Sequence, residues 1–164
     1  MYAKNAHCSY CGQLFKPDQP WPRTCARCQN TSFINPLPVA VVLVPVDGGL
    51  LAIRRGVAPR QGMLALPGGF IDVGESWQAA GAREVFEETG VSVDPARIRD
   101  VRVLSAPDGT VLIFGIAPPL AAADLPPFAP HAEASERVIL AEPAELAFPL
   151  HTQVVRDYFA SLGA

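Results

Sequence analysis

Acidic side chains are concentrated in one short segment that is bounded by glycines. Its spacing is G-x5-E-x7-R-E-x2-E-E-x-G, and the fixed positions are Gly69, Glu75, Arg83, Glu84, Glu87, Glu88 and Gly90. Residues of an α-helix advance by about 100° each, so Glu84, Glu87 and Glu88 would share one face. Carboxylates crowded in this way repel one another, and Mg²⁺ or Mn²⁺, which take oxygen ligands, would relieve the repulsion. The segment therefore predicts a divalent-metal site that could hold a diphosphate.

A helix must position these carboxylates, and both of its ends can be read in the sequence. Ser76 is a suitable N-cap and Gly90 a suitable left-handed C-cap, which predicts a helix over about Trp77–Thr89. Gly68 and Gly69 permit the close turns that lead the chain into this helix. The alternative is an exposed acidic helix face without a function, but that interpretation does not account for the flanking glycines.

The whole segment resembles the signature of the Nudix hydrolase family, whose MutT-like members share every fixed position. The approach to it is also similar, with LLAIRR at Leu50–Arg55 and LPGGF at Leu66–Phe70, although Leu64 stands where members often have Trp. The resemblance implies an α/β fold class, a Nudix α/β/α sandwich with a mixed sheet, over residues 37–164. It also implies metal-dependent hydrolysis of the pyrophosphate bond of a nucleoside diphosphate linked to another moiety.

The resemblance also assigns roles to the acidic segment. It implies that Glu84, Glu87 and Glu88, with the backbone of Gly69, bind Mg²⁺ or Mn²⁺, or that one of the three glutamates orients the attacking water. Arg83 would hold the glutamates in place. Glu87, Glu84 and Arg83 are therefore the expected catalytic residues of this segment.

Family members often supply a further carboxylate from a late loop, as a metal ligand or general base. Glu136, and after it Glu133, resembles that position, and Glu136 completes the expected catalytic set. Arg54, Arg55 and Arg60 lie near the point where a loop should enter the site and could bind phosphate oxygens. For these acids and arginines, simple exposure without a function remains the alternative.

The four cysteines form a second pattern, Cys8-x2-Cys11-x13-Cys25-x2-Cys28. Two C-x2-C pairs at this separation predict a zinc ribbon, in which the four thiolates complete a tetrahedron around Zn²⁺. Because no coordination position is left open for water, the zinc would be structural. Disulfides or a redox pair are the alternatives, and His7 is interpreted as a surface residue. The predicted ribbon and its linker occupy residues 1–36.

A zinc ribbon ahead of such a domain resembles the NADH pyrophosphatase branch and related ADP-ribose-type hydrolases. The NADH branch carries an SQPWPFPxS-like motif after the glutamate segment, where this chain has the unmatched stretch Pro118–Pro130. The QPWP at Gln19–Pro22 lies on the wrong side of that segment. The resemblance of the zinc ribbon and of the Leu66–Phe70 context favours ADP-ribose or a nucleotide sugar as the substrate, with NADH, an NAD cap or a nucleoside triphosphate as alternatives. A nucleotide-sensing regulator that binds nucleic acid is less favoured, because every charged position of the signature is present.

Composition limits the partners that the protein is expected to have. The chain has 164 residues, of which 49% are hydrophobic, and a net charge of −3. No stretch approaches about 18 apolar residues and the first residues lack a signal-peptide core, so a cytoplasmic protein with no membrane partner is expected. The ribbon could cover the Nudix core, form a dimer contact or bind nucleic acid. Nucleic acid is not expected as its partner, because Arg23 and Arg27 make it only mildly basic and Lys4 and Lys16 are the only lysines of the chain. The family resemblance suggests a homodimer.

Hydrophobic patterning predicts the remaining elements. A β-branched run predicts a strand at Val39–Val46, and Asp47-Gly48-Gly49 predicts a hairpin turn into a strand at Leu50–Arg54. Further strands are predicted at Val101–Leu104, Thr110–Ile116 and Val138–Ala141, and a closing helix at His151–Leu162. His131 and His151 are interpreted as surface or packing residues.

Overall fold

The computed structural model describes residues 4–163. The chain divides into two compact units, Met1–Pro36 and Leu37–Ala164. In the first unit β1 (Arg23–Thr24) pairs antiparallel with β2 (Thr31–Ser32). Its small core contains buried Phe15 together with the cysteines. Each unit therefore has a core of its own.

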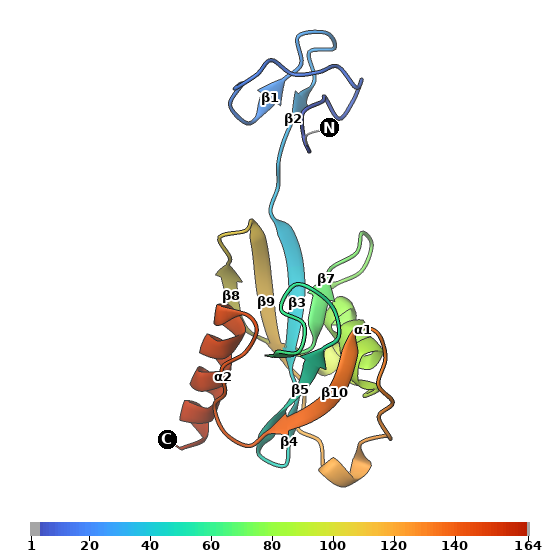
Figure 1. Ribbon diagram of the computed structural model, residues 1–164, viewed down its shortest axis with the longest axis vertical. Helices are drawn as coiled ribbons and strands as arrows, with labels where there is room; N and C mark the ends of the chain where they lie inside the picture. Colours follow the sequence, from blue (N-terminus) through green and yellow to red (C-terminus); the bar gives the residue numbers. More distant parts are fainter. Residues whose placement is uncertain (1–3, 164) are drawn as a thin grey trace. The chain divides into compact units, whose positions relative to one another are not determined.

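The second unit contains two four-stranded sheets, drawn in Figure 1. In the first sheet β3 (Leu37–Leu43) pairs antiparallel with β7 (Gly68–Phe70) and parallel with β9 (Thr110–Ile116). β9 also pairs antiparallel with β8 (Arg99–Ser105). Parallel and antiparallel pairs occur together, so the predicted mixed sheet is confirmed.

The second sheet is centred on β5 (Gly49–Arg55), which has three antiparallel partners. They are β10 (Ala134–Leu140), β4 (Pro45–Val46) and β6 (Leu64–Ala65). β10 begins four residues before the strand predicted at Val138–Ala141, because its pairing with β5 continues as far as Arg55. This extension moves Glu136 from a loop into a strand.

The single strand predicted at Val39–Val46 is wrong, because the chain changes sheets within it. β3 ends at Leu43 and β4 begins at Pro45 in the other sheet. Proline has no N–H to donate to a ladder, which favours its place as the first residue of a new strand. The predicted hairpin that follows is confirmed: Asp47 (φ 47°) and Gly48 (φ 82°) are both left-handed, as a type I′ turn requires.

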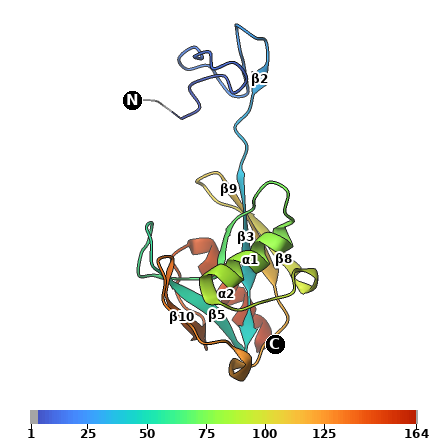
Figure 2. The same ribbon diagram turned by 90° about the vertical axis from the view of Figure 1, so that its right-hand side faces the viewer.

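Two helices lie on opposite sides of the sheets (Figures 1 and 2), namely α1 (Trp77–Thr89) and α2 (Pro149–Leu162). Successive side chains of a strand point to opposite faces. Val41 of β3 accordingly packs in a cluster with Val155 of α2, whereas Val42 packs in a cluster with Val85 of α1. These two layers of apolar contacts confirm the predicted α/β/α sandwich.

The ends of α1 agree with the sequence prediction. Ser76 Oγ accepts a hydrogen bond of 3.1 Å from Ala79 N–H, and Gly90 adopts a left-handed φ of 73°. Short 3-10 helices η1 (Pro95–Arg97) and η2 (Ala122–Asp124) precede and follow the β8–β9 hairpin. Within the described residues, no helix has the length and apolar character needed to cross a membrane.

Candidate metal and substrate site

The acidic segment lines a cavity of about 450 Å³ in the second unit. Its walls come from α1, from β7, from the end of β5 and from the residue before β10. The lining residues are Arg55, Val57, Gly68, Gly69, Phe70, Asp72, Arg83, Glu84, Glu87, Glu88 and Glu133. Five of them carry carboxylates and two carry guanidinium groups, so the cavity is strongly polar and acidic.

Arg83 is the centre of a network of charged hydrogen bonds. Its guanidinium donates to Glu75 at 2.8 Å, to Glu84 at 2.7 Å and to Glu87 at 3.1 Å. It also donates to the carbonyl of Phe70 at 3.0 Å, which ties α1 to β7. The bond to Glu75 is the main cause that raises the pKa of Arg83, and it lowers the pKa of Glu75. Arg83 therefore stays charged and fixes the positions of the three carboxylates.

The most buried carboxylate of the site belongs to Glu88. Its side chain accepts a hydrogen bond of 3.0 Å from Gly68 N–H. Burial raises the pKa of Glu88 to about 8, although the bond from Gly68 lowers it, and the charge of Glu84 raises it further. Burial also raises the pKa of Glu84, in spite of its bond to the arginine.

The cavity is narrow where β7 meets α1. A Cβ at Gly69 would overlap the carboxylate of Glu84, so only glycine permits this close approach. Two carboxylates whose pKa values are raised lie beside a glycine backbone that leaves no room for a side chain. This arrangement fits a hard divalent cation, whose charge would stabilise the ionised carboxylates.

Glu133, and not Glu136, lines this cavity, and the predicted loop position of Glu136 is wrong because the residue lies in β10. Glu136 lies in β10 opposite Arg54, and the two exposed side chains form an ion pair of 2.7 Å. Glu133 precedes β10 and lines the acidic cavity, where its charge contributes to the raised pKa values of Glu84 and Glu88. Glu136 is held in the edge strand by its pairing with β5, whereas Glu133, the residue before that strand, lines the cavity together with residues of α1.

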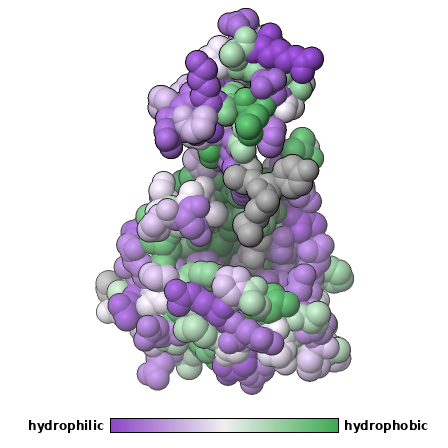
Figure 3. Space-filling model, turned by 45° about the horizontal axis from the view of Figure 1, so that its top comes forward, coloured by the Kyte–Doolittle hydropathy of each residue, from purple (hydrophilic) through white to green (hydrophobic). Residues whose placement is uncertain are grey.

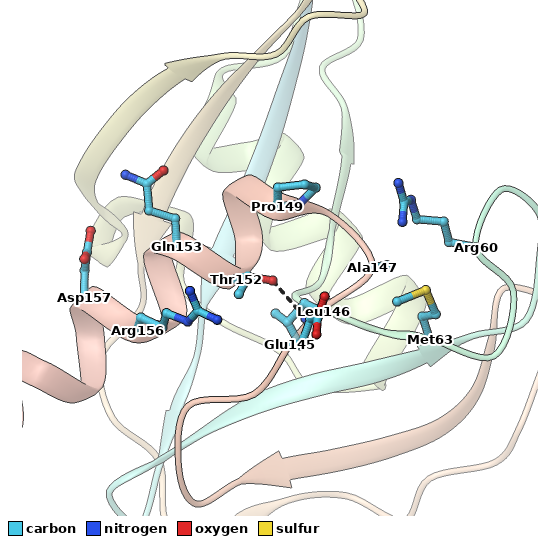
Figure 4. Close-up of a pocket in the computed structure, with 10 residues that line it drawn as sticks. All are labelled: Arg60, Met63, Glu145, Leu146, Ala147, Pro149, Thr152, Gln153, Arg156 and Asp157. Atoms are coloured by element: carbon cyan, nitrogen blue, oxygen red, sulfur yellow. Dashed lines mark hydrogen bonds between the residues drawn. The ribbon is translucent and has the colours of Figure 1, made fainter.

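Of the three arginines predicted to bind phosphate, only Arg55 lines the acidic cavity. Its Nε donates to the carbonyl of Pro59 at 3.0 Å, and its guanidinium carbon lies 5.1 Å from the ring centroid of Phe148. Arg54 is occupied by its ion pair across the sheet. Arg60 lines a separate cavity of about 390 Å³ beside the start of α2 (Figure 4). The three arginines therefore do not lie together at one phosphate-binding site.

The sequence prediction missed Val57, Phe70 and Asp72, which also line the acidic cavity. Phe70 and Asp72 lie inside the acidic segment, and their place directly after the glycine turn was the signal that could have found them. Val57 carries no such signal, because a single aliphatic residue in a loop has no characteristic pattern.

The four cysteines of the first unit converge, with all four sulfur atoms within 4.8 Å of one another. Cys8 and Cys28 Sγ lie 3.6 Å apart, and Cys11 and Cys25 Sγ lie 3.7 Å apart. A tetrahedral site with Zn–S bonds of about 2.3 Å requires sulfur separations of about 3.8 Å. A disulfide would require about 2.05 Å. The arrangement is therefore that of a zinc ribbon.

The pKa values of these thiols also favour a cation bound between them. At Cys8 burial raises the pKa, but hydrogen bonds from the backbone of Tyr10 and Cys11 lower it to about 6. At Cys11 a backbone hydrogen bond involving Gln13 lowers the pKa, but burial and the neighbouring sulfurs raise it to about 11. Four thiols this close together cannot all ionise unless a cation lies among them.

Comparison with known sequences identifies the family. The NUDIX domain family matches residues 35–154. The chain is 33% identical over 97 residues to the NAD-capped RNA hydrolase NudC of Edwardsiella ictaluri, covering 58% of this chain and 37% of that protein. The NudC of Salmonella typhi is 32% identical over the same share of each chain. The chain thus spans little more than a third of the length of these curated relatives.

Solved structures show the same architecture. A NUDIX hydrolase from Nitrosomonas europaea aligns with a TM-score of 0.77 and 26% identity, over 94% of this chain and 90% of that one. The NUDIX domain of NrtR from Shewanella oneidensis, solved with ADP ribose, aligns with a TM-score of 0.63 and 20% identity, over 80% and 91%. The sandwich and its complete acidic segment are those of a Nudix domain. The chain belongs to the Nudix family, and a four-cysteine zinc ribbon precedes its Nudix domain.

Proposed function

We propose that this protein hydrolyses the pyrophosphate bond of a nucleoside diphosphate that is linked to another moiety. The observation that carries the proposal is the acidic cavity, in which five carboxylates and two arginines surround the glycine turn at Gly69. In this proposal residues 37–164 form the catalytic domain and residues 1–36 form the zinc ribbon.

The residues present fit Mg²⁺ or Mn²⁺ as the catalytic cofactor. Glu84, Glu87 and Glu88 would supply hard oxygen ligands, and the backbone of Gly69 would lie against them. When bound, such an ion neutralises diphosphate charge and lowers the pKa of a water molecule. Glu88, with its pKa of about 8, would give up its proton as the ion binds.

The side chains around these ligands have separable roles in the proposal. Arg83 is a positioning residue, because it holds Glu84 and Glu87 by direct hydrogen bonds. Arg55 would donate to the phosphate oxygens of the substrate. Glu133 would accept the proton of the attacking water as the general base, in the place that the sequence prediction gave to Glu136.

ADP-ribose or a nucleotide sugar is the substrate class that we favour. The chain lacks the expected NADH-branch motif after the acidic segment, and a structural neighbour binds ADP ribose in the same fold. NAD-capped RNA or NADH is the second candidate, because the curated relatives are named as NAD-capped RNA hydrolases. A nucleoside triphosphate is the third.

A substrate panel tests the proposal. Product release would be measured with Mg²⁺ and with Mn²⁺ on ADP-ribose, a nucleotide sugar, NADH, NAD-capped RNA and a nucleoside triphosphate. We expect the highest kcat/KM for ADP-ribose or the nucleotide sugar, with a nucleoside monophosphate as one product. A clear preference for NAD-capped RNA would select the second candidate. Tight nucleotide binding without any turnover would instead favour the hypothesis that the protein is a nucleotide-sensing regulator.

A substitution in the acidic cavity tests whether the measured hydrolysis takes place there. Glu87→Gln is expected to lower kcat by more than about 100-fold while the fold is retained. Glu142→Gln, an exposed glutamate outside the cavity, is the matched control and should keep normal turnover. Undiminished hydrolysis by Glu87→Gln would show that the acidic cavity is not the active site.

A further inference from the structure

The charge of this chain is divided unevenly between its two units. Residues 1–36 contain four basic side chains and one acidic one, a net charge of +3, whereas residues 37–164 contain nine basic and fifteen acidic ones, a net charge of −6. The net charge of the whole chain conceals this difference. Zn²⁺ and the four thiolates that hold it would together add a charge of about −2. The zinc-loaded first unit therefore remains slightly positive, in contrast to the negative second unit.

The basic side chains of the first unit are available to a ligand. Lys4, Lys16 and Arg27 are exposed, and none of them takes part in an ion pair within residues 4–163. Arg23 lies over the aromatic ring of Trp21, with its guanidinium carbon 4.6 Å from the ring centroid. Arg23 is half-buried and its Nε donates to the carbonyl of Gln19 at 2.6 Å, which leaves its terminal N–H groups for a phosphate.

Exposed apolar rings and chains accompany these charges. Tyr10 is 64% exposed and Phe33 is 63% exposed, and Leu14 and Ile34 are also exposed. Figure 3 shows hydrophobic residues lying among hydrophilic ones on this part of the surface. A small module that exposes two aromatic rings and also carries exposed basic side chains has the composition of a surface on which bases stack.

One exposed aromatic residue and one exposed basic residue are each the sequence neighbour of a cysteine of the cluster. Tyr10 directly precedes Cys11, and Arg27 directly precedes Cys28. The sulfur atoms of those two cysteines lie within 4.8 Å of each other, so the tips of both knuckles flank one metal site. The tyrosine can stack on a base while the arginine meets the adjoining phosphate.

We propose that the first unit binds single-stranded nucleic acid, through base stacking on Tyr10 and phosphate contacts of Lys16, Arg23 and Arg27. This inference reverses the expectation of no nucleic-acid partner, which considered the small number of lysines and not the separate charges of the two units. It does not depend on which nucleotide the second unit hydrolyses.

The test uses the full-length, zinc-loaded protein and a fluorescein-labelled single-stranded RNA of about 12 nucleotides, a length that spans one small binding module. Anisotropy titrations would be made between about 50 and about 200 mM KCl, where phosphate contacts give a steep salt dependence. Single-stranded DNA and duplex RNA of the same sequence are the comparison probes. We expect both single strands to bind more tightly than the duplex, and equal or tighter duplex binding would overturn the proposal.

Charge reversal tests the phosphate contacts. Lys16→Glu combined with Arg27→Glu is expected to weaken binding by at least about 10-fold and to reduce the salt slope by about 1.4, since each single-strand contact contributes about 0.7. Arg97→Glu combined with Arg99→Glu makes the same charge change at exposed arginines of the second unit and should leave the affinity nearly unchanged. An equal loss of RNA affinity in the two double variants would show that only the net charge of the protein matters, and it would overturn the proposal.

The stacking contact has its own variants. Tyr10→Ala is expected to weaken binding by at least about 5-fold, and Tyr10→Phe, which keeps the ring, should restore it. Zinc content and hydrolysis of the preferred nucleotide are measured for every variant, so that loss of the ribbon or failure of the proposed enzyme activity is recognised separately. Unchanged RNA binding by Tyr10→Ala, with zinc retained, would contradict the stacking role.

Discussion

In the acidic cavity, the position of a side chain can depend on a single contact with a neighbouring residue. Gly69 is the tightest of these positions, because any side chain would meet the Glu84 carboxylate. Glu84 is in turn held by Arg83 at 2.7 Å, so it has little freedom to move away. The close approach of the Gly69 backbone to the Glu84 carboxylate is therefore fixed by the structure of the site.

Gly69→Ala is expected to weaken Mn²⁺ binding by about 10- to 100-fold, the range for changes that misplace metal ligands. Electron paramagnetic resonance of free Mn²⁺ would measure the affinity. Gly163→Ala is the control, because an added Cβ there meets nothing and its φ of −98° suits alanine. Unaltered Mn²⁺ affinity in Gly69→Ala would remove Glu84 from the proposed ligands.

Two glutamates three residues apart provide a test of the general base. Glu133→Gln is expected to lower kcat by about 10²- to 10⁴-fold, as loss of a general base does, whereas Glu136→Gln should leave kcat within a few-fold of normal. Steady-state kinetics on the preferred substrate would compare the two. A larger loss in Glu136→Gln would return the role to the residue that the sequence prediction chose.

Among the elements, α2 carries a titratable group into the apolar core. His151, in its first turn, is buried, and its Nδ1 accepts a hydrogen bond of 3.3 Å from Leu66 N–H. Its ring centroid lies 5.7 Å from that of Phe114. Burial lowers the pKa of His151 to about 4, and the charge of Arg55 adds to the effect. The interpretation of His151 as a packing residue agrees with this position.

The lowered pKa of His151 predicts a loss of stability in acid. The folded state holds the imidazole neutral, so its contribution is complete above the unfolded pKa of about 6.5 and falls as the pH decreases towards 4. The loss by pH 4 is about 3 kcal/mol of unfolding free energy. Urea unfolding at both ends of this range would measure it.

His151→Gln is the matched variant, because an amide oxygen can accept the bond from Leu66 and does not titrate. Its unfolding free energy should fall less than that of the unchanged protein between pH 6.5 and pH 4. An identical fall in both proteins would assign the acid sensitivity to other groups.

At the scale of the whole molecule, the two units depend on different sources of stability. The second unit has apolar clusters on both faces of its sheets. The first unit has a core that consists of cysteines with Phe15 and Trp21, and a module of this size needs a metal to fold. Loss of zinc should therefore unfold the first unit and leave the second folded.

The two tryptophans allow each unit to be observed separately, since Trp21 lies in the first and Trp77 in the second. Cys25→Ser is expected to abolish binding of about one Zn²⁺ per chain and to shift the fluorescence of Trp21 to that of an exposed indole. Measuring the change in a Trp77→Phe background isolates Trp21, and a Trp21→Phe background shows that Trp77 is unaffected. A Trp21 signal that survives complete zinc removal would contradict the structural role of the metal.

Local spacing along the chain was enough to predict much of this protein. The positions of Glu84, Glu87 and Glu88 on one helix face, and the limits of that helix at Ser76 and Gly90, follow from the geometry of a single element. The cysteine pairs are similar, because each knuckle is a local turn. Residues a few positions apart in a regular element have a fixed relation, whatever the rest of the fold does.

Tertiary structure decided the rest, because strand pairing joins residues far apart in the sequence. The ladder between β5 and β10 placed Glu136 against Arg54 and left Glu133 to the cavity. The change of sheet at Val44, and the separation of Arg55 from Arg60, likewise depend on which strands become neighbours. The sequence by itself determined the chemistry that the acidic segment can support, and long-range pairing determined which other side chains face it.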